Sequence, residues 1–152
     1  MDELIGKNMG PYTITERIGD GGMAIVYKAY QESLNRSVAI KVLRDELARD
    51  QQFVARFRQE ALAAANLDHP NILTVYDAGS ANGKYFIAMA YVDGGTLKDQ
   101  IRQGAIDPER AVSIAIQLAE ALDHAHRQGL IHRDVKPTNV LMTRDGRPLL
   151  TD

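Results

Sequence analysis

The sequence predicts an α+β protein in which a strand-rich first part precedes a helical second part. Three observations carry this prediction: five β-favouring runs lie before residue 90, glycine or Asn-Gly turns punctuate them, and a long helical pattern rich in apolar residues follows. Runs of strands followed by runs of helices are typical of α+β architectures. The break at Asp93-Gly94-Gly95 predicts the junction between two lobes.

The first two strands are predicted around a glycine-rich turn. Residues 12–18 alternate loosely in polarity, residues 19–22 read Gly-Asp-Gly-Gly, and a β-favouring run resumes at residues 25–27. Glycines allow backbone N–H groups to approach phosphate oxygens without an intervening side chain. Such hairpins are also common in proteins that bind no phosphate, so the turn is a weak signal by itself.

The third strand, residues 37–43, is rich in Val and Ile. Because side chains alternate across a strand, Ala39, Lys41 and Leu43 share one face, and Val38, Ile40 and Val42 share the other. Lys41 therefore lies on a largely apolar surface.

A helix is predicted over about residues 50–67, with Phe53, Phe57, Glu60, Ala64 and Leu67 on a single stripe. Glu60 places a charge on that stripe. Because an unpaired buried carboxylate is costly, an inward Glu60 predicts a cationic partner, for which Lys41 is the candidate. The alternative is that Glu60 lies at the edge of the stripe and reaches water. The pattern leaves both interpretations open.

Two further strands are predicted at residues 72–78 and 85–89. Asn82-Gly83 joins them, and this dipeptide favours a hairpin turn in which both central residues have positive φ.

The second part contains a short helix over about residues 96–103 and a long helix over 107–128. Asp107 is the expected N-cap, Pro108 the first helical residue and Gly129 the stop. The apolar residues of the long helix span an arc of roughly 220°, wider than a surface helix needs. We expect part of the apolar surface of this helix to be covered by residues missing from this chain or by a partner. Residues 140–142 and 149–151 predict a short hairpin.

Composition excludes several classes of function. The formal net charge of −2 gives no basic excess for nucleic acid, and the absence of cysteine excludes thiolate nucleophiles and cysteine-ligated zinc. The longest apolar run, Tyr85 to Val92, is shorter than the roughly 18 residues of a membrane span, and the amino terminus lacks a signal pattern. We therefore expect a cytoplasmic chain with no membrane span and no nucleic-acid partner.

Residues 132–139 read His-Arg-Asp-Val-Lys-Pro-Thr-Asn and combine three chemical functions in one loop. Asp134 could accept a hydroxyl proton, Lys136 could neutralise a moving phosphate, and Asn139 could offer an oxygen to Mg²⁺. Asp152 supplies a further carboxylate. Phosphoryl transfer is therefore the leading reaction, and a plain polar turn is the alternative. We expect His132 to be a packed, hydrogen-bonded residue.

The order of these parts resembles the eukaryotic-like Ser/Thr protein kinases, including their bacterial branch, from about Tyr12 to Asp152. The resemblance rests on five features: the glycine-rich loop, Val38-Ala39-Ile40-Lys41, a helix with Glu60, the residue 132–139 motif, and Asp152 as the Asp of an Asp-Phe-Gly triplet. It implies a two-lobe fold with a complete N-lobe, made of a five-stranded antiparallel sheet and one main helix, and only the first part of the helical C-lobe. Residues 1–92 would be the N-lobe and hinge, and residues 93–152 the start of the C-lobe, together one incomplete kinase domain.

The resemblance also implies cofactors and roles. The cofactors are ATP and Mg²⁺, with Mn²⁺ possible. Lys41 would hold the α- and β-phosphates, Glu60 would orient Lys41, Asp134 would be the base, and Lys136 would stabilise the γ-phosphoryl group. Asn139 and Asp152 would hold magnesium, and Met89 would guard the rear of the adenine pocket. The residues implied to bind nucleotide are Ile18, Gly19, Asp20, Gly21, Gly22, Val26, Ala39, Lys41, Ala90, Val92 and Leu141.

The sequence departs from the family pattern in two respects. Ala24 replaces the third glycine of the loop, and the chain ends at Asp152. We therefore expect an ATP-dependent Ser/Thr protein kinase, acting on protein hydroxyls, whose present portion is weak or inactive alone. The alternative is a non-catalytic nucleotide-binding or regulatory fragment that docks on a complete kinase. Self-association through the helix over 107–128 is also expected.

Overall fold

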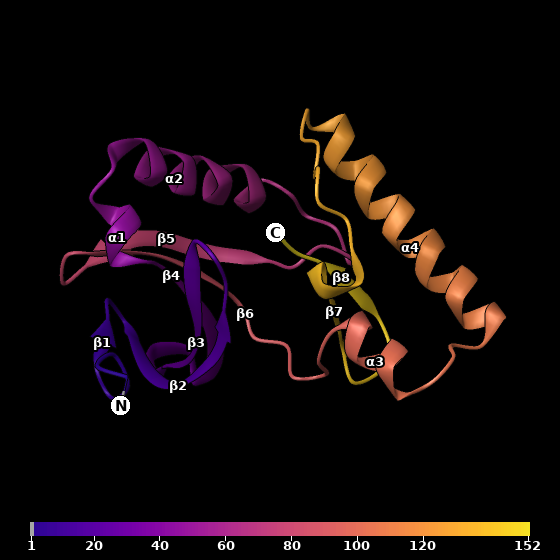
Figure 1. Ribbon diagram of the computed structural model, residues 1–152, viewed down its shortest axis with the longest axis horizontal. Helices are drawn as coiled ribbons and strands as arrows, with labels where there is room; N and C mark the ends of the chain where they lie inside the picture. The colour runs from indigo at the N-terminus through magenta and orange to yellow at the C-terminus, as the bar shows by residue number, and fades with distance from the viewer. Residues whose placement is uncertain (1) are drawn as a thin grey trace. The chain divides into compact units, whose positions relative to one another are not determined.

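The computed structural model describes residues 2–152, and the chain forms two compact units. Unit 1 contains residues 2–66 together with Thr74–Tyr91. Unit 2 contains Leu67–Leu73 together with Val92–Asp152. Figure 1 labels the helices and strands of both. The chain thus enters unit 2 briefly at residues 67–73 and returns to unit 1 before its final passage.

Within the described residues, unit 1 contains one six-stranded sheet in the order β1-β2-β3-β4-β6-β5, and every neighbouring pair is antiparallel. The five predicted strands are present. The sequence analysis missed β1, which is only two residues long. The strands are β1 (Asn8–Met9), β2 (Tyr12–Asp20), β3 (Ala24–Gln31), β4 (Arg36–Leu43), β5 (Val75–Ala81) and β6 (Lys84–Ala90), and the 3₁₀ turn η1 (Glu32–Leu34) joins β3 to β4.

One face of this sheet forms the hydrophobic core of unit 1. Tyr27, Ile40 and Ala88 lie opposite one another on β3, β4 and β6, and each is at most 2% exposed. The predicted alternation along β4 is confirmed, since Val38, Ile40 and Val42 belong to this core. The full core cluster is Met9, Tyr12, Ile14, Tyr27, Ala29, Val38, Ile40, Val42, Phe86 and Ala88.

Helix α2 (Gln51–Ala65) follows the short α1 (Asp45–Ala48) and lies beside β5 in Figure 1. The Asp50 carboxylate caps α2 by accepting a hydrogen bond from the backbone N–H of Gln52 (2.9 Å). The buried stripe is Val54, Phe57 and Ala61, one position away from much of the predicted stripe. Glu60 is exposed, which agrees with the edge-of-stripe alternative.

The hairpin between β5 and β6 has the predicted turn, because Asn82 (φ 54°) and Gly83 (φ 76°) both have positive φ. The predicted start of β5 was wrong. Ile72 does not pair within this sheet; it forms a parallel bridge with Leu150 of unit 2. The backbone N–H of Leu150 donates to the Asn71 carbonyl (2.8 Å), and that of Leu73 donates to the Leu150 carbonyl (3.0 Å).

Unit 2 packs its helices around a short hairpin. Its elements are α3 (Leu97–Gln103), α4 (Pro108–Arg127), the 3₁₀ turn η2 (Pro137–Asn139), and the paired strands β7 (Val140–Met142) and β8 (Pro148–Leu150). The core contains Ile72, Leu97, Ile114, Ala121, Val140, Met142 and Leu150. Buried Asn71 ties these parts together, because its Nδ2 donates to the Pro148 carbonyl (3.0 Å) and to Gln117 Oε1 on α4 (3.1 Å).

The helix ends of unit 2 have distinct capping arrangements. Thr96 and Asp99 form a capping box at the start of α3, and hydrogen bonds from the Thr96 backbone and then its side chain hold the pKa of Asp99 below its ordinary value. Asp107 is the N-cap residue of α4 as predicted, although its side chain makes no capping hydrogen bond. Gly129 (φ 82°) ends α4 as predicted, with Gly129 and Leu130 donating to the carbonyls of His126 and Ala125.

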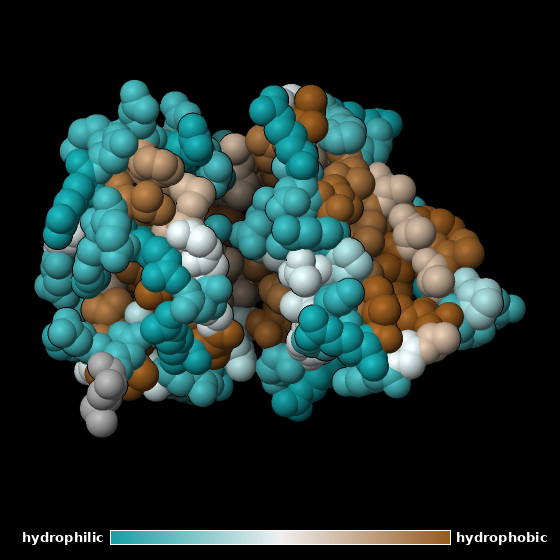
Figure 2. Space-filling model, in the orientation of Figure 1, coloured by the Kyte–Doolittle hydropathy of each residue, from teal (hydrophilic) through white to brown (hydrophobic). Residues whose placement is uncertain are grey.

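One side of α4 remains apolar and exposed, as the wide apolar arc predicted. Val112 is 58% exposed and Ile116 is 53% exposed. Figure 2 shows apolar residues gathered along this helix. Among the described residues, the helices are all too short or too polar to cross a bilayer.

Candidate active site

The glycine-rich turn of unit 1 is a tight reversal between β2 and β3. The backbone N–H of Gly21 donates to the Ala24 carbonyl across it (2.9 Å). A methyl group at Gly19 would lie 3.4 Å from Val26 Cβ, and one at Gly21 would lie 3.3 Å from the Ala24 carbonyl oxygen. A methyl group at Gly22 would meet no atom within 4 Å, and Gly22 has no positive φ. The fold therefore gives no internal reason for glycine at position 22.

Ala24, which replaces the third glycine, is buried (3% exposed) and pairs with Leu43 on β4. A small side chain fits at this position.

Four of the residues predicted to bind nucleotide share the sheet face opposite the core of unit 1: Gly19, Val26, Ala39 and Lys41. Gly19, Val26, Lys41 and Ile87 lie in register across four strands. Two residues further along β4, Ala39 lies in register with Met89 of β6. Residues directly opposite on adjacent strands project from the same face, so this register brings the glycine turn, Lys41, Ala39 and Met89 onto one surface.

The remaining nucleotide-binding residues lie at the margins of this surface or in unit 2. Ile18 is 44% exposed on β2. Ala90 pairs with Val38, and its backbone N–H donates to the Thr74 carbonyl (2.9 Å). The backbone N–H of Ala90 is therefore already hydrogen-bonded within unit 1. Val92 begins the second passage through unit 2, and Leu141 on β7 forms an isolated bridge with Thr96.

Unit 2 brings the predicted catalytic loop together around Asp134. Asn139 Nδ2 donates to the backbone carbonyl of Asp134 (2.9 Å) and to its Oδ2 (3.1 Å). Lys136 Nζ lies 3.3 Å from the same Oδ2. Asp134, Lys136 and Asn139 thus form one connected set, as the spacing of the motif predicted. The Asp134–Lys136 pair is largely exposed, so its energetic contribution is modest.

His132 connects this loop to the segment that carries Asp152. Its Nδ1 accepts a hydrogen bond from the Asp134 backbone N–H (3.1 Å), and its Nε2 lies 2.8 Å from the Thr151 carbonyl oxygen. The Thr151 N–H donates to the Asn139 carbonyl (3.0 Å). The expected hydrogen-bonded role of His132 is therefore correct. The sequence did not predict that His132 connects Asp134 to Thr151.

The oxygen donors of unit 2 suit a hard divalent cation. Both Nδ2 hydrogen bonds of Asn139 point to Asp134, which identifies Oδ1 as the atom Asn139 can offer to a metal. Asp152 follows Thr151 with φ 55°, and its carboxylate is the second candidate oxygen donor. Throughout residues 2–152, no three or more His, Cys, Asp or Glu side chains gather as a metal cluster. An amide oxygen plus one or two carboxylates, completed by phosphate and water, is nevertheless typical of Mg²⁺.

The comparisons with known proteins agree with this arrangement. The family described as "Protein kinase domain" matches residues 12–152. A probable serine/threonine-protein kinase of Clostridium perfringens, CPE1738, is 48% identical over 151 residues, covering 98% of this chain and 22% of the relative. The serine/threonine-protein kinase PrkC of Bacillus subtilis is 47% identical, covering 98% of this chain and 23% of the relative.

A solved structure has the same fold. The crystal structure of the Mycobacterium tuberculosis PknI kinase domain superposes with a TM-score of 0.84 at 37% identity, covering 100% of this chain and 62% of that one. The chain spans about a fifth of the length of the curated relatives quoted above. The α+β fold with a curled antiparallel sheet and a partial helical lobe, the sequence motifs and the relatives converge, and the chain belongs to the protein kinase family, among the bacterial serine/threonine kinases.

Proposed function

We propose that this chain carries the nucleotide-binding and catalytic-loop residues of an ATP-dependent kinase that transfers a phosphoryl group from Mg-ATP to a protein Ser or Thr hydroxyl. The observation that carries the proposal is the Asp134-centred network. It joins the candidate base, a cationic side chain and a metal-binding amide through bonds of 2.9 to 3.3 Å.

Each residue then has a defined task. The Asp134 carboxylate accepts the proton of the attacking hydroxyl, and Lys136 balances negative charge on the transferred group. Asn139 Oδ1 and the Asp152 carboxylate would hold the magnesium ion, which would supply positive charge to offset that of the phosphates. Lys41 binds the α- and β-phosphates. The exposed position of Glu60 gives no support to the role of orienting Lys41 that the family resemblance implied.

The glycine turn covers the phosphates in this proposal. Support comes from Gly22, whose missing side chain serves no purpose in the packing of unit 1. A glycine that the packing of the protein does not require is consistent with close approach of a ligand to the backbone. The apolar side chains of Val26 and Ala39 in unit 1 would contact the adenine.

Substitutions at Gly22 and Lys41 test nucleotide binding by this chain. Titration calorimetry with Mg-ATP should show binding that Lys41→Met removes and Gly22→Ala weakens. The free energy of unfolding of Gly22→Ala should match the parent, because the added methyl group meets no atom. Equal affinity in the parent and Lys41→Met would contradict the proposal.

A second candidate is a non-catalytic nucleotide-binding fragment that docks on a kinase. The exposed Val112 and Ile116 on α4 favour it, because such an apolar face is suited to contact with another protein or a second copy. Phosphate transfer from labelled ATP to a basic protein distinguishes the two. Steady transfer that is lost in Asp134→Asn would exclude the non-catalytic fragment.

A further inference from the structure

Arg44, at the end of β4, makes three bonds to the glycine turn. Its backbone N–H donates to the Met23 carbonyl (3.0 Å), and its Nε donates to the Gly21 carbonyl (3.0 Å). Its terminal Nη2 forms an ion pair with Asp20 Oδ1. One half-buried arginine thus contacts most of the turn.

Asp20 places a negative charge inside this turn. Its other oxygen, Oδ2, pairs with Arg17. Arg17 is shared, because its Nη1 also lies 3.5 Å from Asp2 Oδ2. Arg44 is therefore the cation dedicated to Asp20 and, unlike Arg17, it also binds the turn's backbone.

We propose that Arg44 is a positioning residue that clamps the glycine turn and neutralises Asp20, so that the turn presents an ordered, uncharged surface to the phosphates of a nucleotide. This inference rests on the proposed function. It gives a role to Arg44, which lies outside the glycine motif. It also explains how the negative charge of Asp20 inside the motif is balanced.

Two physical effects support the clamp. Glycine-rich segments lose more conformational entropy on ordering than other sequences, so a turn that is already ordered binds its ligand at lower cost. A free carboxylate beside a polyphosphate also weakens binding by charge repulsion. Arg44 counters both effects at once.

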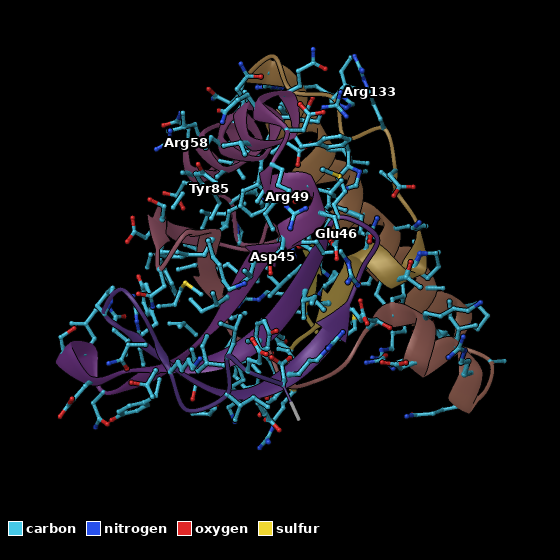
Figure 3. All side chains as sticks on the ribbon, turned by 60° about the vertical axis from the view of Figure 1, so that its left-hand side comes forward. Asp45, Glu46, Arg49, Arg58, Tyr85 and Arg133 are labelled. Atoms are coloured by element: carbon cyan, nitrogen blue, oxygen red, sulfur yellow. The ribbon has the colours of Figure 1, made fainter. Side chains whose placement is uncertain are left out.

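Amide hydrogen exchange tests the clamp without any nucleotide. In Arg44→Met, the backbone N–H groups of Gly21 and of residue 44 should exchange with solvent several-fold faster than in the parent. The reason is that the side-chain hydrogen bond and ion pair of Arg44, which hold the turn, are gone. Arg58→Met is the matched control, since Arg58 is exposed on α2, away from the turn, in Figure 3. Unchanged exchange in Arg44→Met would overturn the clamp.

Nucleotide titration tests the charge balance. Arg44→Met should weaken Mg-ATP affinity roughly two- to fivefold, as expected for loss of a partly exposed ion pair. The double variant Asp20→Asn with Arg44→Met should recover part of that loss, because it removes the negative charge that Arg44 had helped to balance. A double variant no better than Arg44→Met, or an unaffected single variant, would refute the charge balance. A parent chain that binds no nucleotide would instead refute the proposed function, and the exchange experiment would still decide the clamp.

Discussion

Asn139 donates both of its side-chain hydrogen bonds to Asp134, one to the backbone carbonyl and one to the carboxylate. The candidate base is thereby held by the same side chain that, in the proposed function, would offer an oxygen to a metal. The Asn139 amide thus couples the loop conformation and the Asp134 orientation to the proposed metal site.

Replacing Asn139 should therefore remove the effect of magnesium on nucleotide binding. Asn139→Ala loses the metal oxygen and both bonds to Asp134, and we expect the gain in ATP affinity on adding Mg²⁺ to fall by about tenfold, which corresponds to roughly 1.4 kcal/mol. Titrations with and without Mg²⁺ measure it. Thr138→Ala, at an exposed neighbouring position, is the control, and an undiminished magnesium effect in Asn139→Ala would exclude Asn139 as a ligand.

Gly94 should not tolerate a side chain. A methyl group there would lie 2.0 Å from the Met142 carbonyl oxygen, because the Met142 N–H donates to the neighbouring Gly95 carbonyl (2.8 Å) and draws the two segments together. Gly94→Ala should lower the free energy of unfolding of unit 2 by about 2 kcal/mol or more. Urea unfolding would show this loss, and the same measurement on Gly22→Ala should show none. Equal stability of both variants would contradict the packing at Gly94.

The local motifs could be identified from the sequence because each is a short run with fixed spacing. The Asp134, Lys136 and Asn139 set and the Asn82-Gly83 turn are of this kind. The contacts of His132 with Thr151 and of Ile72 with Leu150 could not be predicted, because both depend on where the β7–β8 hairpin folds back. The stripe on α2 was misplaced because helical spacing alone did not decide which of two adjacent residues is buried. Val54 and Ala61 are buried, whereas Phe53 is half-buried and Glu60 is exposed.

The capping box of α3 should contribute measurable stability. Thr96 Oγ1 accepts from the Asp99 N–H (3.1 Å), and Asp99 Oδ2 accepts from the Thr96 N–H (2.9 Å). Thr96→Ala should reduce the free energy of unfolding by about 1 kcal/mol, whereas Thr96→Ser keeps the hydroxyl and should remain close to the parent. Urea unfolding of the three proteins measures the difference. Indistinguishable stabilities of Thr96→Ala and the parent would argue against the box.

Tyr27 should make unit 1 sensitive to alkaline pH. Burial, followed by the hydrogen bond to Asp2 Oδ2 (2.7 Å) and the charge of that carboxylate, raises the pKa of Tyr27 to about 12. Since the folded pKa lies above the ordinary value of 10.0, the neutral hydroxyl contributes stability that is complete below pH 10 and is lost as the pH rises toward 12.

Tyr27→Phe should flatten that decline, as measured by the free energy of unfolding at pH 8, 10 and 11. Tyr30→Phe, at an exposed site on the same strand, should decline as the parent does. A parallel decline in Tyr27→Phe and the parent would show that Tyr27 does not cause it.

The bridge between Ile72 and Leu150 also bears on how the protein is made. Residues 67–73 leave the ribosome long before the hairpin that pairs with them, so the bridge between Ile72 and Leu150 cannot form until residues 148–150 have been synthesised. Until then, the Asn71 side-chain amide lacks the Pro148 carbonyl that it binds in the folded structure. The sheet of unit 1, whose strands all end by Ala90, can form first and serve as the stable part of the nascent chain.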